Sequence, residues 1–271
     1  MFSALPIASQ KIPSRLSSSI LLRVPNKPTM PNEQTAAEVA HGRAVREMFS
    51  GIAGKYDLLN HLLSINIDKR WRRLVREKLS DVLGNSDAVV LDVACGTGDL
   101  SIELASHAKA RVIGSDFCRP MLTIAKDKTS ASALPIPYLE SDAMKMPFGD
   151  SSFDAVTIAF GLRNLSNFRE GLVELCRILR PGGRLVVLEF SSPIVPGFRA
   201  VFDFYFTQIL PRIGGVVSGS RGAYEYLPDS VSKFPDQKRL VEMMRGVGFE
   251  SVEYANLTGG IAAVHSGKRS E

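Results

Sequence analysis

The chain has 271 residues, of which 45% are apolar and 23% are charged. This balance is typical of a globular protein with one or two domains, and it excludes a fully disordered chain. Three cysteines without a Cys-x-x-Cys pair, together with four scattered histidines, indicate neither a disulfide framework nor a structural zinc site. The apolar runs are too short to predict a transmembrane helix.

Residues 1–32 differ in composition from the rest of the chain. They contain six serines, five prolines and four basic residues but no acid, so they carry +4 of the net charge of +5. The remaining 239 residues are nearly neutral, which argues against nucleic acid as a partner. Such a composition predicts an organelle transit peptide, for a chloroplast rather than a mitochondrion. A disordered tail without a targeting function is the alternative.

Apolar residues recur at helical spacing over residues 33–83, which predicts helices that precede the main sheet. Short apolar runs then alternate with helical segments. We expect strands at 88–93, 111–115, 138–141, 153–159 and 183–190, and helices at 100–108, 120–129 and 169–179. An aromatic-rich insertion follows at 191–236, before a helix at 235–248 and two strands at 250–256 and 260–266. The alternation predicts a parallel sheet with helices on both faces.

The first expected strand leads into a glycine turn, with the sequence VVLDVACGTGDL at residues 89–100. Glycine permits a sharp turn and the close approach of a ligand, and the helix N-terminus that follows favours an anion. Ser101 stands where a dinucleotide site has its third small residue, so this turn alone does not exclude NAD.

Asp116 stands at the end of the second expected strand, downstream of the glycine turn. An acid at this place can accept both ribose hydroxyls of a nucleoside cofactor. The alternative is a cap for the helix that begins near Pro120. The glycine turn upstream favours ribose binding.

The segment SDAMKMPF at residues 141–148, followed by Phe153 and Asp154, resembles the class I S-adenosylmethionine-dependent methyltransferases. In that class an acid after the third strand receives the adenine amino group. The resemblance implies this role for Asp142, with the Ala143 backbone beside it. The cofactor-binding residues it implies are Tyr56, Asp92, Gly96, Thr97, Gly98, Asp116, Phe117, Asp142, Ala143 and Ala159.

Three further motifs resemble the ubiquinone/menaquinone biosynthesis C-methyltransferases. They are YDLLNHLLS at 56–64 followed by Trp71, FGLRN at 160–164 and RILRPGGRLVVLEFS at 177–191. The resemblance extends over about residues 40–266 and implies one domain over residues 33–271. The implied fold is α/β, the class I methyltransferase Rossmann-like fold, with a seven-stranded, mostly parallel sheet and an N-terminal helical lid.

Two positions depart from the family pattern. Asp68 stands where the family usually has a histidine, three residues before the tryptophan, and Ala159 stands where a serine is common. A general acid–base role at the first position is therefore in doubt. At Ala159 a cofactor contact is retained only if it is made by the backbone, because alanine lacks the serine hydroxyl.

The resemblance implies C-methylation of a reduced quinol with S-adenosylmethionine as the cofactor and no metal. The serine-rich leader and compact core favour a naphthoquinol, demethylphylloquinol, in the chloroplast. A benzoquinol of ubiquinone synthesis in mitochondria is the alternative. The long tail of such a substrate implies peripheral membrane contact, for which Trp71 with its flanking arginines is a candidate. The sequence predicts no particular oligomeric state.

Methylation of a ring carbon requires that a quinol hydroxyl lose its proton, that the oxyanion be stabilised and that the ring be held in line. The resemblance implies Arg163 as the partner of the oxyanion and Asn164 as a group that orients a hydroxyl or a water. Asp57 and His61 are candidates for a proton relay. A structural ion pair and a helix cap are the respective alternatives for Arg163 and Asn164. An NAD-dependent oxidoreductase and a non-catalytic scaffold are the rival functions.

Overall fold

The computed structural model describes residues 34–57, 66–194 and 221–271. Seven strands form one sheet in the order β3-β2-β1-β4-β5-β7-β6. The strands are β1 (Val89–Val93), β2 (Arg111–Asp116), β3 (Tyr138–Glu140), β4 (Phe153–Ala159), β5 (Leu179–Phe190), β6 (Phe249–Leu257) and β7 (Ala262–Arg269). The pairs from β3 to β5 are parallel, whereas β7 is antiparallel to β5 and β6. The predicted seven-stranded, mostly parallel sheet is confirmed.

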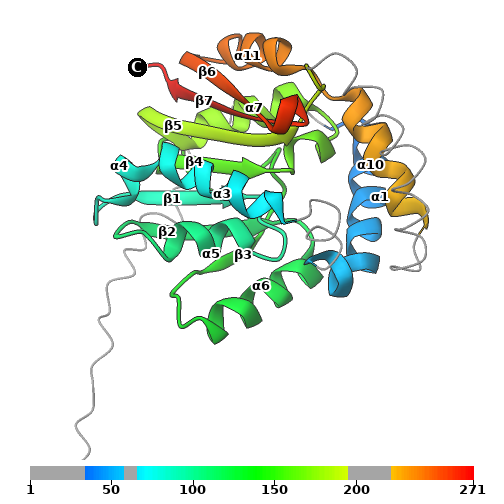
Figure 1. Cartoon of the computed structure of the whole chain (residues 1–271), viewed down its shortest axis with the longest axis horizontal. Helices are drawn as coiled ribbons and strands as arrows, with labels where there is room; N and C mark the ends of the chain where they lie inside the picture. Colours follow the sequence, from blue (N-terminus) through cyan, green and yellow to red (C-terminus); the bar gives the residue numbers. More distant parts are fainter. Residues whose placement is uncertain (1–33, 58–65, 195–220) are drawn as a thin grey trace, which may run out of the picture.

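Helices cover both faces of the sheet (Figure 1). The longer ones are α1 (Ala36–Ile52), α3 (Ile67–Lys78), α5 (Asp99–Ala105), α6 (Arg119–Ala131), α7 (Phe168–Ile178), α10 (Arg221–Lys233) and α11 (Gln237–Arg245). The short ones are η1 (Ala53–Lys55), α4 (Ser80–Leu83), η2 (Leu162–Asn164) and η4 (Thr258–Gly260). Among the described helices, none is both long and apolar enough to span a membrane.

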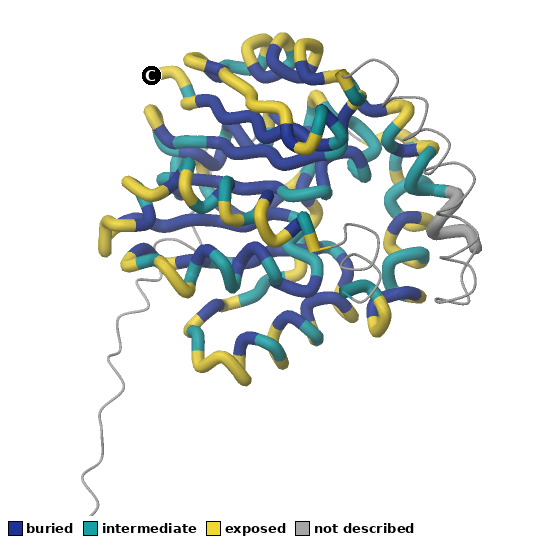
Figure 2. The backbone as a smooth tube through the Cα atoms, viewed as in Figure 1, coloured by how far each residue is buried: buried dark blue, intermediate teal, exposed yellow. Residues whose placement is uncertain are grey.

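The apolar core divides into two layers, one on each face of the sheet. Leu91 and Val93 of β1 belong to the layer that packs against α7 and α11. Val90 belongs to the layer that packs against α3, α4 and α5. Alternate residues of a strand point to opposite faces, so a run such as VVLDV can fill both layers. The central strands are accordingly buried along their length (Figure 2).

The helix α1 lies along the edge of the sheet where the parallel strands end, beside α10 (Figure 1). Its N-terminus has a capping box, in which Thr35 and Glu38 each bind the other's backbone N–H. Asn167 Nδ2, at the start of α7, donates to Glu38 Oε1 over 3.2 Å. These contacts put the predicted N-terminal helix over the carboxyl ends of the strands.

Several element boundaries differ from those predicted. The fifth strand begins at Leu179 rather than at residue 183, because Leu179 pairs with Phe153 before a shift in register. The last strand, β7, begins at Ala262, after the turn formed by η4. The leader and most of the aromatic insertion, including residues 198–206, lie outside the described residues.

Candidate functional site

The glycine turn connects β1 to α5 as the sequence predicts. Gly98 has φ +84°, and a Cβ there would lie 2.6 Å from the Tyr138 hydroxyl, so this position requires glycine. Gly96 has φ +56°, and a Cβ there would meet only the Tyr56 ring, at 3.7 Å. The Gly96 backbone is therefore open toward a cavity that it lines.

Asp92 lies beneath this turn rather than in the cavity. It is fully buried and accepts hydrogen bonds from Ser101 Oγ (2.6 Å) and Thr157 Oγ1 (2.8 Å). Burial raises the pKa of this carboxyl to about 6, and the two hydroxyls act in the opposite direction. Asp92 thus joins β1, β4 and α5 and supports the turn from below, and it is not among the residues that line the cavity.

Asp116 ends β2 and lines the cavity. Its Oδ2 accepts the Gly96 N–H and its Oδ1 accepts the Cys118 N–H, both over 2.8 Å. A carboxylate has about four acceptor positions, and the Phe117 backbone also acts on this one, so Asp116 keeps acceptor capacity for a further donor. Burial raises the pKa of Asp116 to about 6, although these backbone hydrogen bonds lower it. The arrangement suits a pair of vicinal hydroxyls such as those of a ribose.

Binding of S-adenosylmethionine, the cofactor that the sequence resemblance implies, should weaken as the pH falls through about 6. In the ligand-free protein Asp116 is ionised above that pKa and protonated below it, and a protonated carboxyl loses acceptor capacity for the ribose hydroxyls. Calorimetry with S-adenosylhomocysteine between pH 5 and pH 8 measures this dependence. Asp116→Asn is the matched control, because it has no proton to gain at this position. Wild-type affinity that does not change across this pH range would exclude Asp116 as the titrating ligand.

The other end of the cavity is formed by the segment after β3. Asp142 Oδ1 accepts the Met144 N–H (2.9 Å) and Asp142 Oδ2 accepts Gln34 Nε2 (3.2 Å). Ala143 and Phe117 add apolar surface beside this carboxylate. An acceptor between apolar walls suits a flat ring that carries an amino group, such as adenine.

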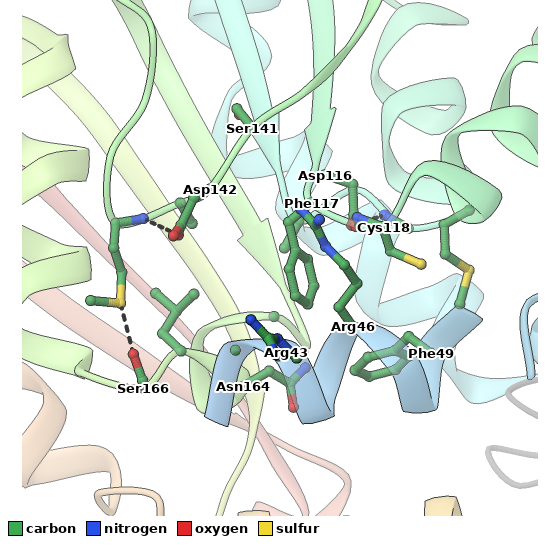
Figure 3. Close-up of a pocket in the computed structure, with 18 of the residues that line it drawn as sticks. Arg43, Arg46, Phe49, Asp116, Phe117, Cys118, Ser141, Asp142, Asn164 and Ser166 are labelled. Carbon is green, nitrogen blue, oxygen red and sulfur yellow. Dashed lines mark hydrogen bonds between the residues drawn. The ribbon is translucent and has the colours of Figure 1, made fainter. Parts of the chain in front are cut away.

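The helix α1 contributes a wall of the cavity (Figure 3), in keeping with the expected N-terminal helical lid, although none of its residues was among the predicted site residues. Its lining residues are Glu38, Val39, Gly42, Arg43, Arg46 and Phe49. The Arg46 guanidinium lies 5.6 Å from the centroid of the Phe117 ring and 3.6 Å from Glu140 Oε1. These residues recur at intervals of three and four, which places them on one face of a helix. The sequence therefore contained this pattern, but it did not indicate that this face of α1 would line a cavity.

A third wall follows β4, where Ala159, Phe160, Gly161 and Asn164 line the cavity. Phe160 has φ +56°, a conformation that a bulky residue adopts only when its surroundings hold it. Asn164 Nδ2 donates to the Phe160 carbonyl (3.2 Å), and the Tyr226 hydroxyl donates to Asn164 Oδ1 (3.1 Å). The amide of Asn164 is thus held from both sides at the cavity wall.

Arg163 lies behind this wall and does not line the cavity. It is 8% exposed and forms an ion pair with Glu189, with Nη1 2.7 Å from Oε1. The guanidinium also packs over the Phe190 ring at 5.3 Å. Among the described residues its Nε has no hydrogen-bond partner. Burial raises the pKa of Glu189, whereas the charge of Arg163 lowers it.

The structure separates the predicted site residues into three groups. Those that line the cavity are Tyr56, Gly96, Asp116, Phe117, Asp142, Ala143, Ala159 and Asn164. Those that lie outside its lining are Asp57, Asp92, Thr97, Gly98 and Arg163. His61 lies outside the described residues.

The cavity has a volume of ≈ 290 Å³, a size suited to a small organic ligand. Asp116 and Asp142 match the ribose hydroxyls and the adenine amino group, and Gly96 leaves room for close approach. The residues present therefore fit an adenosine-containing cofactor. No group of three or more metal-ligating side chains occurs among the described residues.

Comparison with known proteins agrees with this geometry. Residues 36–269 match the ubiE/COQ5 methyltransferase family. The chain belongs to this family. It is an S-adenosylmethionine-dependent methyltransferase.

Two relatives illustrate the likeness of this methyltransferase to curated proteins. It is 50% identical to the demethylmenaquinone methyltransferase of Deinococcus radiodurans, over 84% of this chain and 93% of the relative. It is 44% identical to the ubiquinone/menaquinone biosynthesis C-methyltransferase UbiE of Geotalea uraniireducens, over 84% of this chain and 97% of the relative.

Two solved structures share the fold at low sequence identity. One is a putative methyltransferase in a complex with the Haloferax volcanii Trm112 activator, with a TM-score of 0.60, 15% identity and coverage of 82% of this chain and 98% of that chain. The other is an S-adenosylmethionine-dependent methyltransferase from Aquifex aeolicus, with a TM-score of 0.53, 20% identity and coverage of 72% and 89%.

Proposed function

We propose that this methyltransferase transfers a methyl group from S-adenosylmethionine to a ring carbon of a prenylated naphthoquinol, converting demethylphylloquinol to phylloquinol in the chloroplast. The observation that carries the proposal is a cofactor cavity whose wall after β4 holds the Asn164 amide in place. Relatives at 50% identity are named demethylmenaquinone methyltransferases, and demethylmenaquinone is a naphthoquinone.

The cofactor, when bound, supplies an activated methyl group. The protein must make the ring carbon nucleophilic and hold it in line. Asn164 offers a fixed amide to a hydroxyl of that ring, and the Phe160 carbonyl accepts a hydrogen bond from this amide. Arg163 lies behind this wall in an ion pair with Glu189, and its guanidinium would favour the ionised form of the hydroxyl only to the extent that Glu189 leaves its charge uncompensated.

Asp57 is a poor candidate for a proton relay. Both of its carboxylate oxygens are engaged, Oδ1 by Thr97 Oγ1 and Oδ2 by Lys128 Nζ, and the residue does not line the cavity.

The long tail of the substrate supports a peripheral contact with a membrane, but Trp71 does not provide it. Trp71 is 4% exposed, and its indole N–H donates to Thr258 Oγ1 over 3.1 Å. Its neighbour Arg72 forms ion pairs with Asp68 and Asp99. Val39 of α1 lines the cavity and is 46% exposed, so we propose that the tail leaves the cavity past this side chain.

A benzoquinol of ubiquinone synthesis in mitochondria is the second candidate, because relatives at 44–45% identity are named for both ubiquinone and menaquinone. Values of kcat/KM for reduced demethylnaphthoquinol and for the demethyl benzoquinol, both in detergent micelles, distinguish the two. A preference for the naphthoquinol supports the proposal. A preference for the benzoquinol would contradict the proposal and assign the protein to ubiquinone synthesis.

The proposed location rests on residues 1–32, which carry six serines and no acid. Fusion of this segment to a fluorescent protein, followed by import into isolated chloroplasts and mitochondria, tests it. Uptake by chloroplasts with shortening of the fusion is the expected result, and uptake by mitochondria alone would contradict the chloroplast assignment.

A further inference from the structure

A polar cluster outside the cavity joins three segments that are remote in sequence. Asp57 follows η1, Thr97 belongs to the glycine turn, and Lys128 lies on α6. Thr97 Oγ1 donates to Asp57 Oδ1, and Lys128 Nζ donates to Asp57 Oδ2 over 2.9 Å. Lys128 Nζ also lies 3.4 Å from Thr97 Oγ1, so the three side chains contact one another.

Lys128 is bound at the same time to a second acid, Asp99, at the first residue of α5. Arg72 approaches the other oxygen of Asp99 (3.4 Å) and pairs with Asp68 (2.8 Å). Alternating cations and carboxylates thus link α3, α5, α6 and the residues after η1. Lys128 is 28% exposed and Asp57 is 31% exposed. A network of several charges fixes geometry more firmly than one exposed pair does.

The cluster adjoins the cofactor cavity, because residues next to its members in the sequence line that cavity. Tyr56 precedes Asp57, lines the cavity and faces Gly96, and Gly96 precedes Thr97. Phe49 packs edge-on against Tyr56, with ring centroids 6.0 Å apart. Because Asp57 and Thr97 are bound to each other, the positions of the neighbouring residues Tyr56 and Gly96, which both line the cavity, are coupled.

We propose that Lys128 is a positioning residue for the cofactor: it joins Asp57 to the glycine turn and so holds Tyr56 over Gly96. Lys128 does not line the cavity, so it acts on the cofactor through these two residues. The role of Asp57 is then to orient the cavity wall rather than to carry a proton. This inference rests on the cofactor site and is independent of which quinol accepts the methyl group.

Calorimetry with S-adenosylhomocysteine tests the proposal without any methyl acceptor. Lys128→Met should weaken binding by about tenfold, the effect of losing charge-assisted hydrogen bonds at a partly exposed site. Lys126→Met is the matched control: it removes an exposed lysine from the same helix and should bind as the wild type does. Lys128→Arg, which keeps the charge, should recover much of the affinity. In steady-state assays KM for S-adenosylmethionine should rise more than kcat falls.

A double-mutant cycle separates positioning from a general loss of stability. Asp57→Asn should weaken binding to a similar extent, and the pair Asp57→Asn/Lys128→Met should be little worse than either single variant. Hydrogen exchange on the ligand-free protein should show faster exchange of residues 53–57 in Lys128→Met than in Lys126→Met. Wild-type affinity in Lys128→Met, or strictly additive losses in the cycle, would overturn the proposal. If Lys128→Met does not fold, the proposal is tested with Asp57→Asn and Lys128→Arg instead, by their affinity for S-adenosylhomocysteine and by hydrogen exchange of residues 53–57.

Discussion

Replacing Asp116 by alanine is expected to weaken the binding of S-adenosylhomocysteine by about 100-fold, because two hydrogen bonds to a charged acceptor are worth about 3 kcal/mol together. The variant should also be less stable than the wild type. The carboxylate accepts the Gly96 and Cys118 N–H groups, and its removal leaves both without their acceptor. The free energy of unfolding should fall by about 1–3 kcal/mol in consequence. Calorimetry and urea unfolding measure the two effects.

Asp116→Asn separates binding from support of the turn, since its amide oxygen can still accept one backbone N–H. We expect this variant to lose less stability than the alanine variant while its affinity for the cofactor falls in the same direction. An alanine variant that binds S-adenosylhomocysteine with wild-type affinity would contradict the assignment of Asp116 to the ribose.

Replacing Arg163 by methionine is expected to reduce the free energy of unfolding by about 3–5 kcal/mol, since it leaves the buried carboxylate of Glu189 without its partner. Turnover should also fall, by about 100-fold if a fixed charge near the developing oxyanion is lost. Affinity for S-adenosylhomocysteine should change less than turnover does, because Arg163 contacts Phe160 and Glu189 rather than the glycine turn, Asp116 or Asp142.

The double variant Arg163→Met/Glu189→Gln distinguishes the two roles of Arg163. It removes the unpaired charge, so much of the lost stability should return, whereas turnover should remain low. If the double variant regains stability and also has wild-type turnover, Arg163 has no role in catalysis. It would then serve only as a structural residue in a buried ion pair.

The glycine turn and Asp116 were predictable because each belongs to a single strand-to-loop unit, whereas Asp142 was implied by the resemblance to the class I methyltransferases. A buried apolar strand, a glycine and the next helix occur within a dozen residues, and the carboxyl ends of parallel strands meet at one edge of the sheet. The same local logic correctly predicted the strands and most of the helices. It did not predict the early start of β5, which depends on the pairing of Leu179 with Phe153.

The remaining features depend on contacts between segments far apart in sequence. Nothing in the local pattern of α1 says that Arg43 and Arg46 face the loops after β2 and β3. The pairing of Arg163 with Glu189 requires β4 and β5 to lie side by side, and that of Asp57 with Lys128 requires the packing of α6 against η1. Such pairings are set by tertiary packing and follow only once the sheet order is known.

The most direct test of the account is to determine where the methyl group goes. Protein lacking residues 1–32, S-adenosylmethionine with a deuterated methyl group and reduced demethylnaphthoquinol would be incubated in detergent under anaerobic conditions, and the product examined by mass spectrometry and NMR. The account predicts a deuterated methyl on a ring carbon, both hydroxyls intact, and no product from the oxidised quinone. A methyl group on oxygen, or equal reaction of the oxidised quinone, would contradict it.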